Sequence, residues 1–193
     1  MWVAADTNVG LKREDNEDAV VVSKTADGAF VVVCDGMGGF RGGKLASRLA
    51  ADTMTEQVLR SLKSDMGEVS VRRVLESAAA AANVSVRQAA KNDVALEGMG
   101  TTIVAVAATD KAAHIAHAGD SRAYLLRDDL LTQLTVDHTV IQMLIDRGDI
   151  TRQDAKHHPH RHYITRAVGV EDNLRCDIFS IDLRDGDAIL ICT

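Results

Sequence analysis

The chain changes from short apolar runs to a helical period and then back to short apolar runs. Residues 19–23 and 29–34 are rich in valine and are separated by the turn sequence TADG, which predicts two strands. From Gly43 the apolar residues recur at near-helical spacing, so residues 43–63 are predicted to form a helix. An alanine-rich stretch predicts a second helix over residues 70–91, because alanine has the highest helix propensity.

The second half of the chain is predicted to be mainly β-structure. Residues 101–109 and 112–119 have only a short turn between them, which is the spacing of a tight hairpin. Residues 139–147 predict one more helix, ended by Gly148. Further strands are predicted over residues 122–127, 173–183 and 187–192. Because antiparallel strands and helices come in blocks, the predicted fold class is α+β, with two stacked antiparallel β-sheets flanked by helices.

Composition and charge narrow the class of protein. The chain has 193 residues, of which 46% are hydrophobic, and this suits a single domain spanning residues 1–193. A net charge of −6 without a basic block argues against nucleic acid as a partner. No apolar run approaches the roughly 18 residues of a membrane span, and the N-terminus lacks a signal-peptide pattern. Three widely spaced cysteines fit neither a disulfide framework nor a zinc cluster, which favours a cytoplasmic location.

The glycine-rich sequence VVVCDGMGGFRGG, residues 31–43, suggests at first a phosphate-binding loop. The dinucleotide-binding pattern fails at Arg41, which stands where a third glycine is needed. The spacing of a P-loop is met as far as Lys44, but Leu45 replaces the hydroxyl residue that would hold magnesium. Asp35 would also place a negative charge near the bound anion. A P-loop nucleotide binder is therefore a minor alternative.

A metal site explains this loop better. Hard cations such as Mg²⁺ and Mn²⁺ take carboxylate and backbone carbonyl oxygens, and Asp35 with Gly36 offers both at the end of a strand. Asp18 precedes a predicted strand, and Asp120 follows another. Each acid alone is typical of a turn or a solvated surface. Three such acids in one short domain favour a shared cation site.

Six motifs occur in order along the chain: TNVGLKREDNEDA, VVVCDGMGG, GMGTTIVAV, AHAGDSRAYLLR, LTQLTVDHT and HHPHRHYITRAVG. With these motifs the chain resembles the metal-dependent Ser/Thr protein phosphatases of type 2C, the PPM family, in its bacterial style. The resemblance extends from Thr7 to Cys192. It implies an α-β-β-α sandwich with a metal cluster between the sheets at one end.

The resemblance also implies roles for single residues. Asp35 would bridge two Mn²⁺ or Mg²⁺ ions, and the carbonyl of Gly36 would bind one of them. Asp18 would lie at these ions or just behind them, and Asp120 matches a ligand of a third, weaker metal. Arg13 matches the arginine that binds the substrate phosphate. The implied reaction is attack of a metal-activated water on phosphoserine or phosphothreonine of phosphorylated proteins, including the substrates of a cognate kinase.

The chain departs from the family pattern at several positions. Met37, Phe40 and Lys44 stand where relatives usually carry other residues, and Lys44 brings a cation near the metal loop. The sequence stops at Thr193, where relatives continue with an Asp-Gly turn that supplies a metal ligand. The expectation is a C-terminally incomplete domain with missing strands, an impaired metal site and an exposed sheet edge that favours self-association. The alternative function is a non-catalytic module that binds phosphoproteins.

Most of the histidines and cysteines singled out in the sequence are predicted to have structural roles. The cluster HHPHRH, residues 157–162, falls by resemblance in or near a flap beside the active site, where it would contact substrate or be a plain surface feature. His114 and His117 lie three apart on a predicted strand, so they point to opposite faces and do not chelate one ion. Cys34 lies in an apolar run and is predicted to be a core residue.

Overall fold

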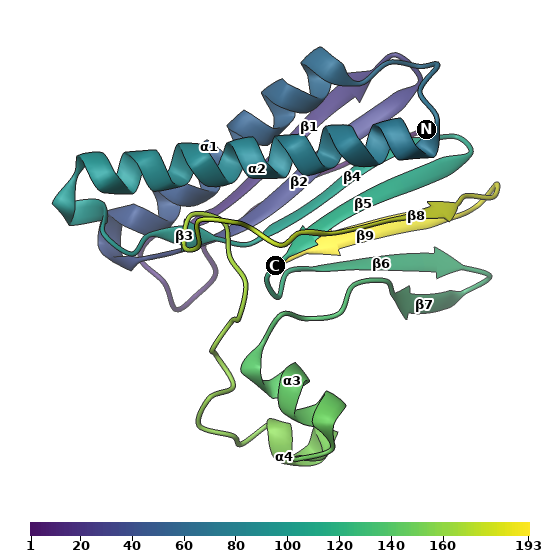
Figure 1. Cartoon of the computed structure of the whole chain (residues 1–193). Coiled ribbons are helices and arrows are strands. Elements are labelled where there is room, and N and C mark those ends of the chain that lie inside the picture. The colour runs from purple at the N-terminus through teal and green to yellow at the C-terminus, as the bar shows by residue number, and fades with distance from the viewer.

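The computed structural model describes residues 1–193, except for the side chains of residues 39 and 40. It contains two antiparallel sheets, and the strands of the larger one follow the order β1-β2-β4-β5-β8, with a short β3 beside β2 (Figure 1). These strands are β1 (Asp18–Thr25), β2 (Gly28–Met37), β3 (Gly100–Thr101), β4 (Ile103–Thr109), β5 (Ala112–Ala118) and β8 (Asp177–Asp182). The smaller sheet has the order β7-β6-β9, formed by β7 (Leu130–Gln133), β6 (Arg122–Arg127) and β9 (Ala188–Cys192). Two antiparallel sheets with flanking helices confirm the predicted fold class.

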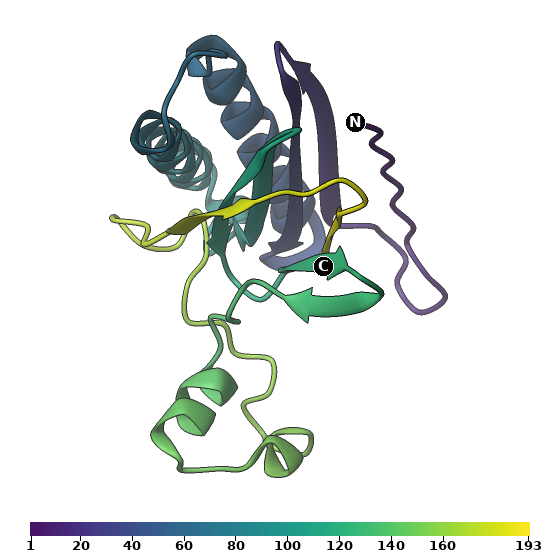
Figure 2. The ribbon, with the colours of Figure 1, turned by 90° about the vertical axis from the view of Figure 1, so that its right-hand side faces the viewer.

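Two long helices cover one face of the larger sheet. They are α1 (Gly39–Ser61) and α2 (Glu68–Asn92), and both lie on the same side of the sheet in Figure 2. A short 3₁₀ turn, η1 (Val94–Leu96), follows them. Small residues on the covered face of the sheet, such as Ala105 and Ala116, let the helices approach closely. Cys34 is fully buried in this layer, which confirms its predicted core position. Among the described residues, no helix is both long and apolar enough to cross a membrane.

A second apolar layer lies between the two sheets. Val104 and Ile115 of the larger sheet pack with Ala123 of β6, and Ile189 and Ile191 of β9 pack against this cluster. Strand residues alternate between the two layers, because successive side chains of a strand point to opposite faces. The turn RDG therefore joins strands of two different sheets, since β8 pairs with β5 and β9 pairs with β6.

Residues 139–165 leave the sheets as a separate excursion, which we call the flap segment. It contains α3 (Val140–Arg147) and α4 (Arg152–Ala155) and projects away from both sheets in Figure 1. As predicted, α3 ends at Gly148, which has the left-handed φ of 79° that glycine favours. The four-residue α4 was not predicted. Its capping box between Thr151 and Asp154 is its local signal.

Helix α1 begins four residues earlier than predicted, inside the glycine-rich sequence. The prediction placed residues 39–42 in a loop, and the reason for the error is tertiary contact. A Cβ on Gly42 would lie 2.9 Å from the Met99 Cβ, and one on Gly43 would lie 2.7 Å from the Glu17 Oε1. These glycines let the first turn of the helix approach its neighbours, which is a different use from loop flexibility.

Candidate metal centre

The predicted acidic residues lie at one end of the larger sheet. Neighbouring antiparallel strands run in opposite directions, so the start of β1, the end of β2 and the end of β5 share an edge. Asp18 and Asp35 are direct cross-strand partners at this edge. Asp120 lies just beyond the end of β5, in the turn that leads to β6. The structure thus brings together three acids that are far apart in the sequence.

The electrostatics of this edge favour a bound cation. Burial, together with the negative charges of Asp18, Asp120 and Glu17, raises the pKa of Asp35 to about 6. Burial also raises the pKa of Asp120, although part of the residue is exposed to solvent. None of the three aspartates forms an ion pair with another described residue. Divalent cations bound among these oxygens would relieve the repulsion, so the residues present fit Mn²⁺ or Mg²⁺.

Thr102 fixes the position of Asp35 and was missed by the sequence analysis. The backbone N–H of Asp35 donates to Thr102 Oγ1 over 2.9 Å, and the N–H of Thr102 donates to the Asp35 carbonyl, also over 2.9 Å. The hydroxyls of Thr102 and Ser121 are 2.6 Å apart. Because Ser121 follows Asp120, this buried threonine ties the end of β2 to the turn that carries Asp120. The adjacent threonines in the motif GMGTT were the available signal.

Gly36 allows the loop before β1 and the start of α1 to meet at the site. Its N–H donates to the carbonyl of Glu17 over 3.1 Å, and the hydroxyl of Ser47 donates to the same carbonyl. A Cβ on Gly36 would lie 2.0 Å from the Gly43 carbonyl oxygen. Any other residue at this position would therefore push α1 away from the strand end.

The structure does not bring every predicted residue to the cluster. Arg13 lies in the exposed loop before β1, and its side chain forms no hydrogen bond or ion pair with the described residues. Lys44 is exposed in the first turns of α1. Thr193, in contrast, reaches the cluster, because its hydroxyl donates to Asp18 Oδ2 over 3.2 Å.

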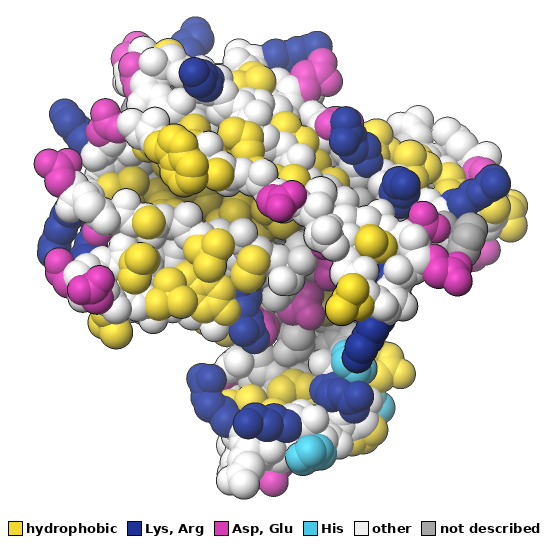
Figure 3. Space-filling view, turned by 180° about the vertical axis from the view of Figure 1, so that it is seen from behind, with side chains coloured by type: hydrophobic (Ala, Val, Ile, Leu, Met, Phe, Trp, Pro, Cys, Tyr) yellow, Lys and Arg dark blue, Asp and Glu magenta, His cyan; other side chains and the backbone are white. Residues whose placement is uncertain are grey.

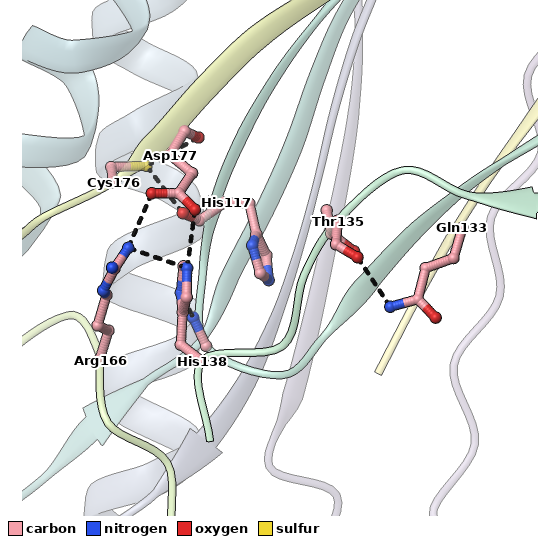
Figure 4. Close-up of polar contacts among 8 residues, drawn as sticks. His117, Gln133, Thr135, His138, Arg166, Cys176 and Asp177 are labelled. Atoms are coloured by element: carbon pink, nitrogen blue, oxygen red, sulfur yellow. Dashed lines mark hydrogen bonds and ion pairs between the residues drawn. The ribbon is translucent and has the colours of Figure 1, made fainter. Parts of the chain in front are cut away.

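A second polar cluster lies next to the β5–β6 turn, where His138 contacts Gly119 (Figure 4). His138 Nε2 is 2.9 Å from Asp177 Oδ2, and Arg166 Nη1 is 2.8 Å from Asp177 Oδ1. The ring of the fully buried His117 stacks on that of His138 with a centroid distance of 4.6 Å. Burial lowers the pKa of His117 to about 4, so this ring is neutral near neutral pH. No pattern in the sequence connects these residues.

His114 has a simpler environment on the opposite face of β5. Its Nδ1 lies 2.7 Å from the Ser180 Oγ of the neighbouring strand β8. The stacked His117 belongs to the other face, as the strand period predicts. The two histidines therefore do not converge on one ion.

A group of carboxylates without cationic partners, at one end of two stacked sheets, suits the binding of divalent cations. The model of the family described as protein phosphatase 2C matches residues 11–193. The chain is 34% identical over 191 residues to the serine/threonine phosphatase Stp of Listeria monocytogenes, covering 97% of this chain and 74% of that protein. It is 36% identical over 190 residues to the serine/threonine protein phosphatase PstP of Mycobacterium tuberculosis, covering 98% of this chain and 35% of that protein.

Solved structures agree with these relatives. The serine/threonine phosphatase of S. agalactiae superposes with a TM-score of 0.87 at 27% identity, over 95% of this chain and 75% of that one. The catalytic domain of PstP in complex with two manganese ions gives a TM-score of 0.79 at 33% identity, over 94% of this chain and 72% of that one. The chain belongs to the protein phosphatase 2C family. It is accordingly a protein phosphatase, and its cofactor is Mn²⁺ or Mg²⁺.

Proposed function

We propose that this chain hydrolyses phosphoserine and phosphothreonine in proteins, and that Asp18, Asp35 and Asp120 hold the divalent cations with help from the carbonyl of Gly36. The observation that carries the proposal is the meeting of three aspartates at one sheet end, where burial and mutual repulsion raise the pKa of Asp35 to about 6. Such perturbed acids without a cationic partner are typical of functional sites.

Different residues of the chain hold the cations and bind the substrate phosphate. When bound, the cations supply the Lewis acidity that activates water and offsets phosphoryl charge. Asp35 and Asp18 fix the place of these cations, because cross-strand pairing and Thr102 hold the backbone at the strand ends. Arg13 lies on an exposed loop, from which its planar guanidinium would bind two phosphate oxygens of the substrate.

The structure gives an independent reason to prefer this chemistry to thiol chemistry. A cysteine-based phosphatase needs a reactive, accessible thiolate. Burial raises the pKa of the Cys34 thiol far above its usual value, and the side chain has no solvent exposure. The cysteine next to the candidate metal ligand Asp35 is therefore a packing residue.

The direct test is hydrolysis of a phosphothreonine peptide with and without Mn²⁺. We expect Mn²⁺-dependent turnover, and a loss of about 100-fold or more in Asp35→Asn, because one of the central cation ligands is lost. Asp52→Asn is the matched control, since Asp52 is an exposed aspartate paired with Arg48 on α1. Turnover that does not depend on Mn²⁺, or full activity of Asp35→Asn, would contradict the proposal.

A second candidate function is a non-catalytic module that binds phosphoproteins. It is favoured by two exposed cations, Arg13 and Lys44, on the loop and helix that border the acidic cluster. Titration calorimetry with Mn²⁺ separates the two functions. Binding of two ions together with turnover excludes the module, whereas phosphopeptide binding without either supports it.

We also propose that residues 1–193 belong to one phosphatase domain that acts in cytoplasmic signalling. The three cysteines support the cytoplasmic location because all three are free thiols. Phosphorylated proteins are the proposed partners. Cell fractionation tests the location, and a change in the phosphoproteome after deletion tests the role in signalling.

We propose self-association through the edges of the two sheets. Strand β9 has a neighbour on one side only, and Val22 of β1 and Leu190 of β9 are exposed apolar residues. Figure 3 shows hydrophobic side chains spread over the side of the molecule seen from behind. Unpaired strands with apolar side chains favour pairing with another chain. Sedimentation analysis should show a dimer whose stability falls in Leu190→Lys.

A further inference from the structure

The base of the flap segment is joined to the rest of the fold at His138. The segment leaves the fold after His138 and returns at Arg166. We call the chain around these two residues the outgoing and the returning stem. The two stems pair through a bridge between Thr139 and Ile164. The Thr165 N–H donates to the His138 carbonyl over 2.8 Å, and the Val140 N–H donates to the carbonyl of Tyr163, a flap residue two positions before Thr165, over 2.9 Å. Everything beyond these contacts projects away from the sheets (Figure 1).

The side chain of His138 reaches in two directions from this base. Its Nδ1 accepts from the N–H of Gly119 over 3.1 Å, so the proton of the neutral ring is on Nε2, which donates to Asp177. The N–H of His138 also donates to the Gly119 carbonyl over 2.8 Å. His138 therefore holds both sides of Gly119, the residue that precedes Asp120.

Asp177 connects the two stems of the flap to the larger sheet. It is the first residue of β8, and its two carboxylate oxygens face His138 on the outgoing stem and Arg166 on the returning stem. One carboxylate on a rigid strand thus binds both stems at once, as Figure 4 shows.

A metal ion does not fit this cluster, although His117, His138 and Asp177 offer ligand atoms within 4.8 Å of one another. The planes of the two imidazole rings are stacked and only 28° apart, so their in-plane lone pairs run side by side and do not converge. The guanidinium of Arg166 lies 3.0 Å from His138 Nε2 and 2.8 Å from Asp177 Oδ1. Asp177 therefore already has a cationic partner.

We propose that His138, Asp177 and Arg166 form a clamp that fixes the flap segment on β8 and, through Gly119, positions Asp120 for cation binding. The three are positioning residues, and the part that concerns Asp120 rests on the proposed function. Gly119 has a φ of +116°, and its N–H and its carbonyl are both held by hydrogen bonds to His138. Release of the clamp would therefore move Asp120 relative to Asp35.

The first test is residue-resolved hydrogen exchange of the metal-free protein, with Arg166→Ala and Asp177→Asn as variants. We expect the amides of Val140 and Thr165 to exchange about 10-fold faster in both variants, because the flap base opens more often. Arg166→Lys keeps the charge and should restore most of the protection. The control is Asp187→Asn, which removes a carboxylate from the comparable Arg127–Asp187 pair in another part of the fold.

The second test is calorimetric titration of the same variants with Mn²⁺. The dissociation constant of the weakest bound ion should rise about 5-fold or more in Arg166→Ala and Asp177→Asn, and stay unchanged in Asp187→Asn. Unchanged exchange at both flap amides would overturn the clamp. Faster exchange with an unchanged weakest ion, or no weak ion in the unaltered protein, would overturn its connection with Asp120. Neither test uses turnover, so failure of the clamp and failure of the proposed phosphatase activity are distinguishable.

Discussion

The three aspartates of the metal centre and the single carboxylate of Asp177 differ in how their charge is compensated. Each oxygen of Asp177 faces a hydrogen-bond donor, one from His138 and one from Arg166. Asp18 and Asp35 lie side by side across two strands, and neither forms an ion pair with a described residue. A fold usually pairs the buried charges that serve only its structure. The group left unpaired is therefore the one that we assign to function.

The pKa values of the two groups express the same difference. Burial and neighbouring acids raise the pKa of Asp35 to about 6. Partial burial alone would raise the pKa of Asp177 as well, but its hydrogen bonds with His138 and Arg166 lower it below the usual value. The folded chain thus disfavours the ionised form of Asp35 and favours the ionised form of Asp177. A bound cation would stabilise the ionised form of Asp35, as Arg166 already does for Asp177.

The largest loss of stability is expected from added side-chain volume at Gly36, next to the unpaired Asp35. Gly36→Ala should destabilise the protein by about 3 kcal/mol or more, because the added Cβ would lie 2.0 Å from the Gly43 carbonyl oxygen. Urea unfolding gives the free energy of unfolding. Gly67→Ala is the control, since a Cβ there meets nothing within 4 Å. An equal effect of the two substitutions would show that the contact of β2 with α1 is dispensable.

Metal addition should stabilise the protein through the unpaired group alone. With Mn²⁺ at 100 times its dissociation constant, we expect the free energy of unfolding to rise by about 2.7 kcal/mol for one site. The gain should vanish in Asp35→Asn and persist in Asp187→Asn, whose carboxylate already has an arginine partner. Thermal or urea unfolding with and without Mn²⁺ measures the gain in the unaltered protein and in each variant. Stabilisation that survives in Asp35→Asn would place the cation elsewhere.

In the metal-free protein, the ionisation of Asp35 should contribute a loss of stability as pH rises from about 4 to 6. In this range Asp35 ionises in the unfolded chain, near 3.8, before it ionises in the folded chain, near 6. The folded state therefore binds more protons, and the free energy of unfolding falls as pH rises. The full shift corresponds to about 3 kcal/mol, which solvent access to the partly exposed group reduces to about 1–2 kcal/mol.

Asp35→Asn should remove this part of the pH dependence in the metal-free protein. The measurement is urea unfolding at pH 4.5 and 7.5, with a chelator present to keep the site metal-free. The variant should be more stable than the unaltered protein at the higher pH and similar at the lower one. A variant that is less stable at both values would mean that Asp35 has a stabilising partner.

The acidic site was visible in the sequence because each part has a local signal. Asp35 follows a run of valines, and Asp18 and Asp120 border strands that composition also predicts. Antiparallel neighbours bring such strand ends to one edge, so a correct assignment of strands goes far towards placing the acids. Arg13 has no such support. Its loop is irregular and exposed, and its assigned role comes from resemblance alone.

The clamp could not be predicted because its contacts depend on topology. His138 and Asp177 are 39 positions apart and belong to segments that meet only when β8 pairs with β5. Strand β7 was missed for a different reason, since all four of its residues are exposed and show no alternation of buried and exposed positions. The pattern of residues within a segment does not predict its structure when contacts with a distant segment determine that structure.

The smallest effect should come from a carboxylate at the surface that already has a cationic partner. Asp52 accepts from Arg48 Nε over 3.0 Å, four residues apart on an exposed face of α1. Asp52→Asn should cost about 0.3–0.5 kcal/mol, because water and side-chain entropy offset most of the attraction of such a pair. The loss should shrink further in 1 M salt, where charges on the surface are screened within about 3 Å. Mn²⁺ affinity and turnover should not change. If Asp52→Asn weakened Mn²⁺ binding as Asp35→Asn does, then negative charge anywhere on the molecule would matter to the cation, and the difference between paired and unpaired carboxylates would no longer locate the site.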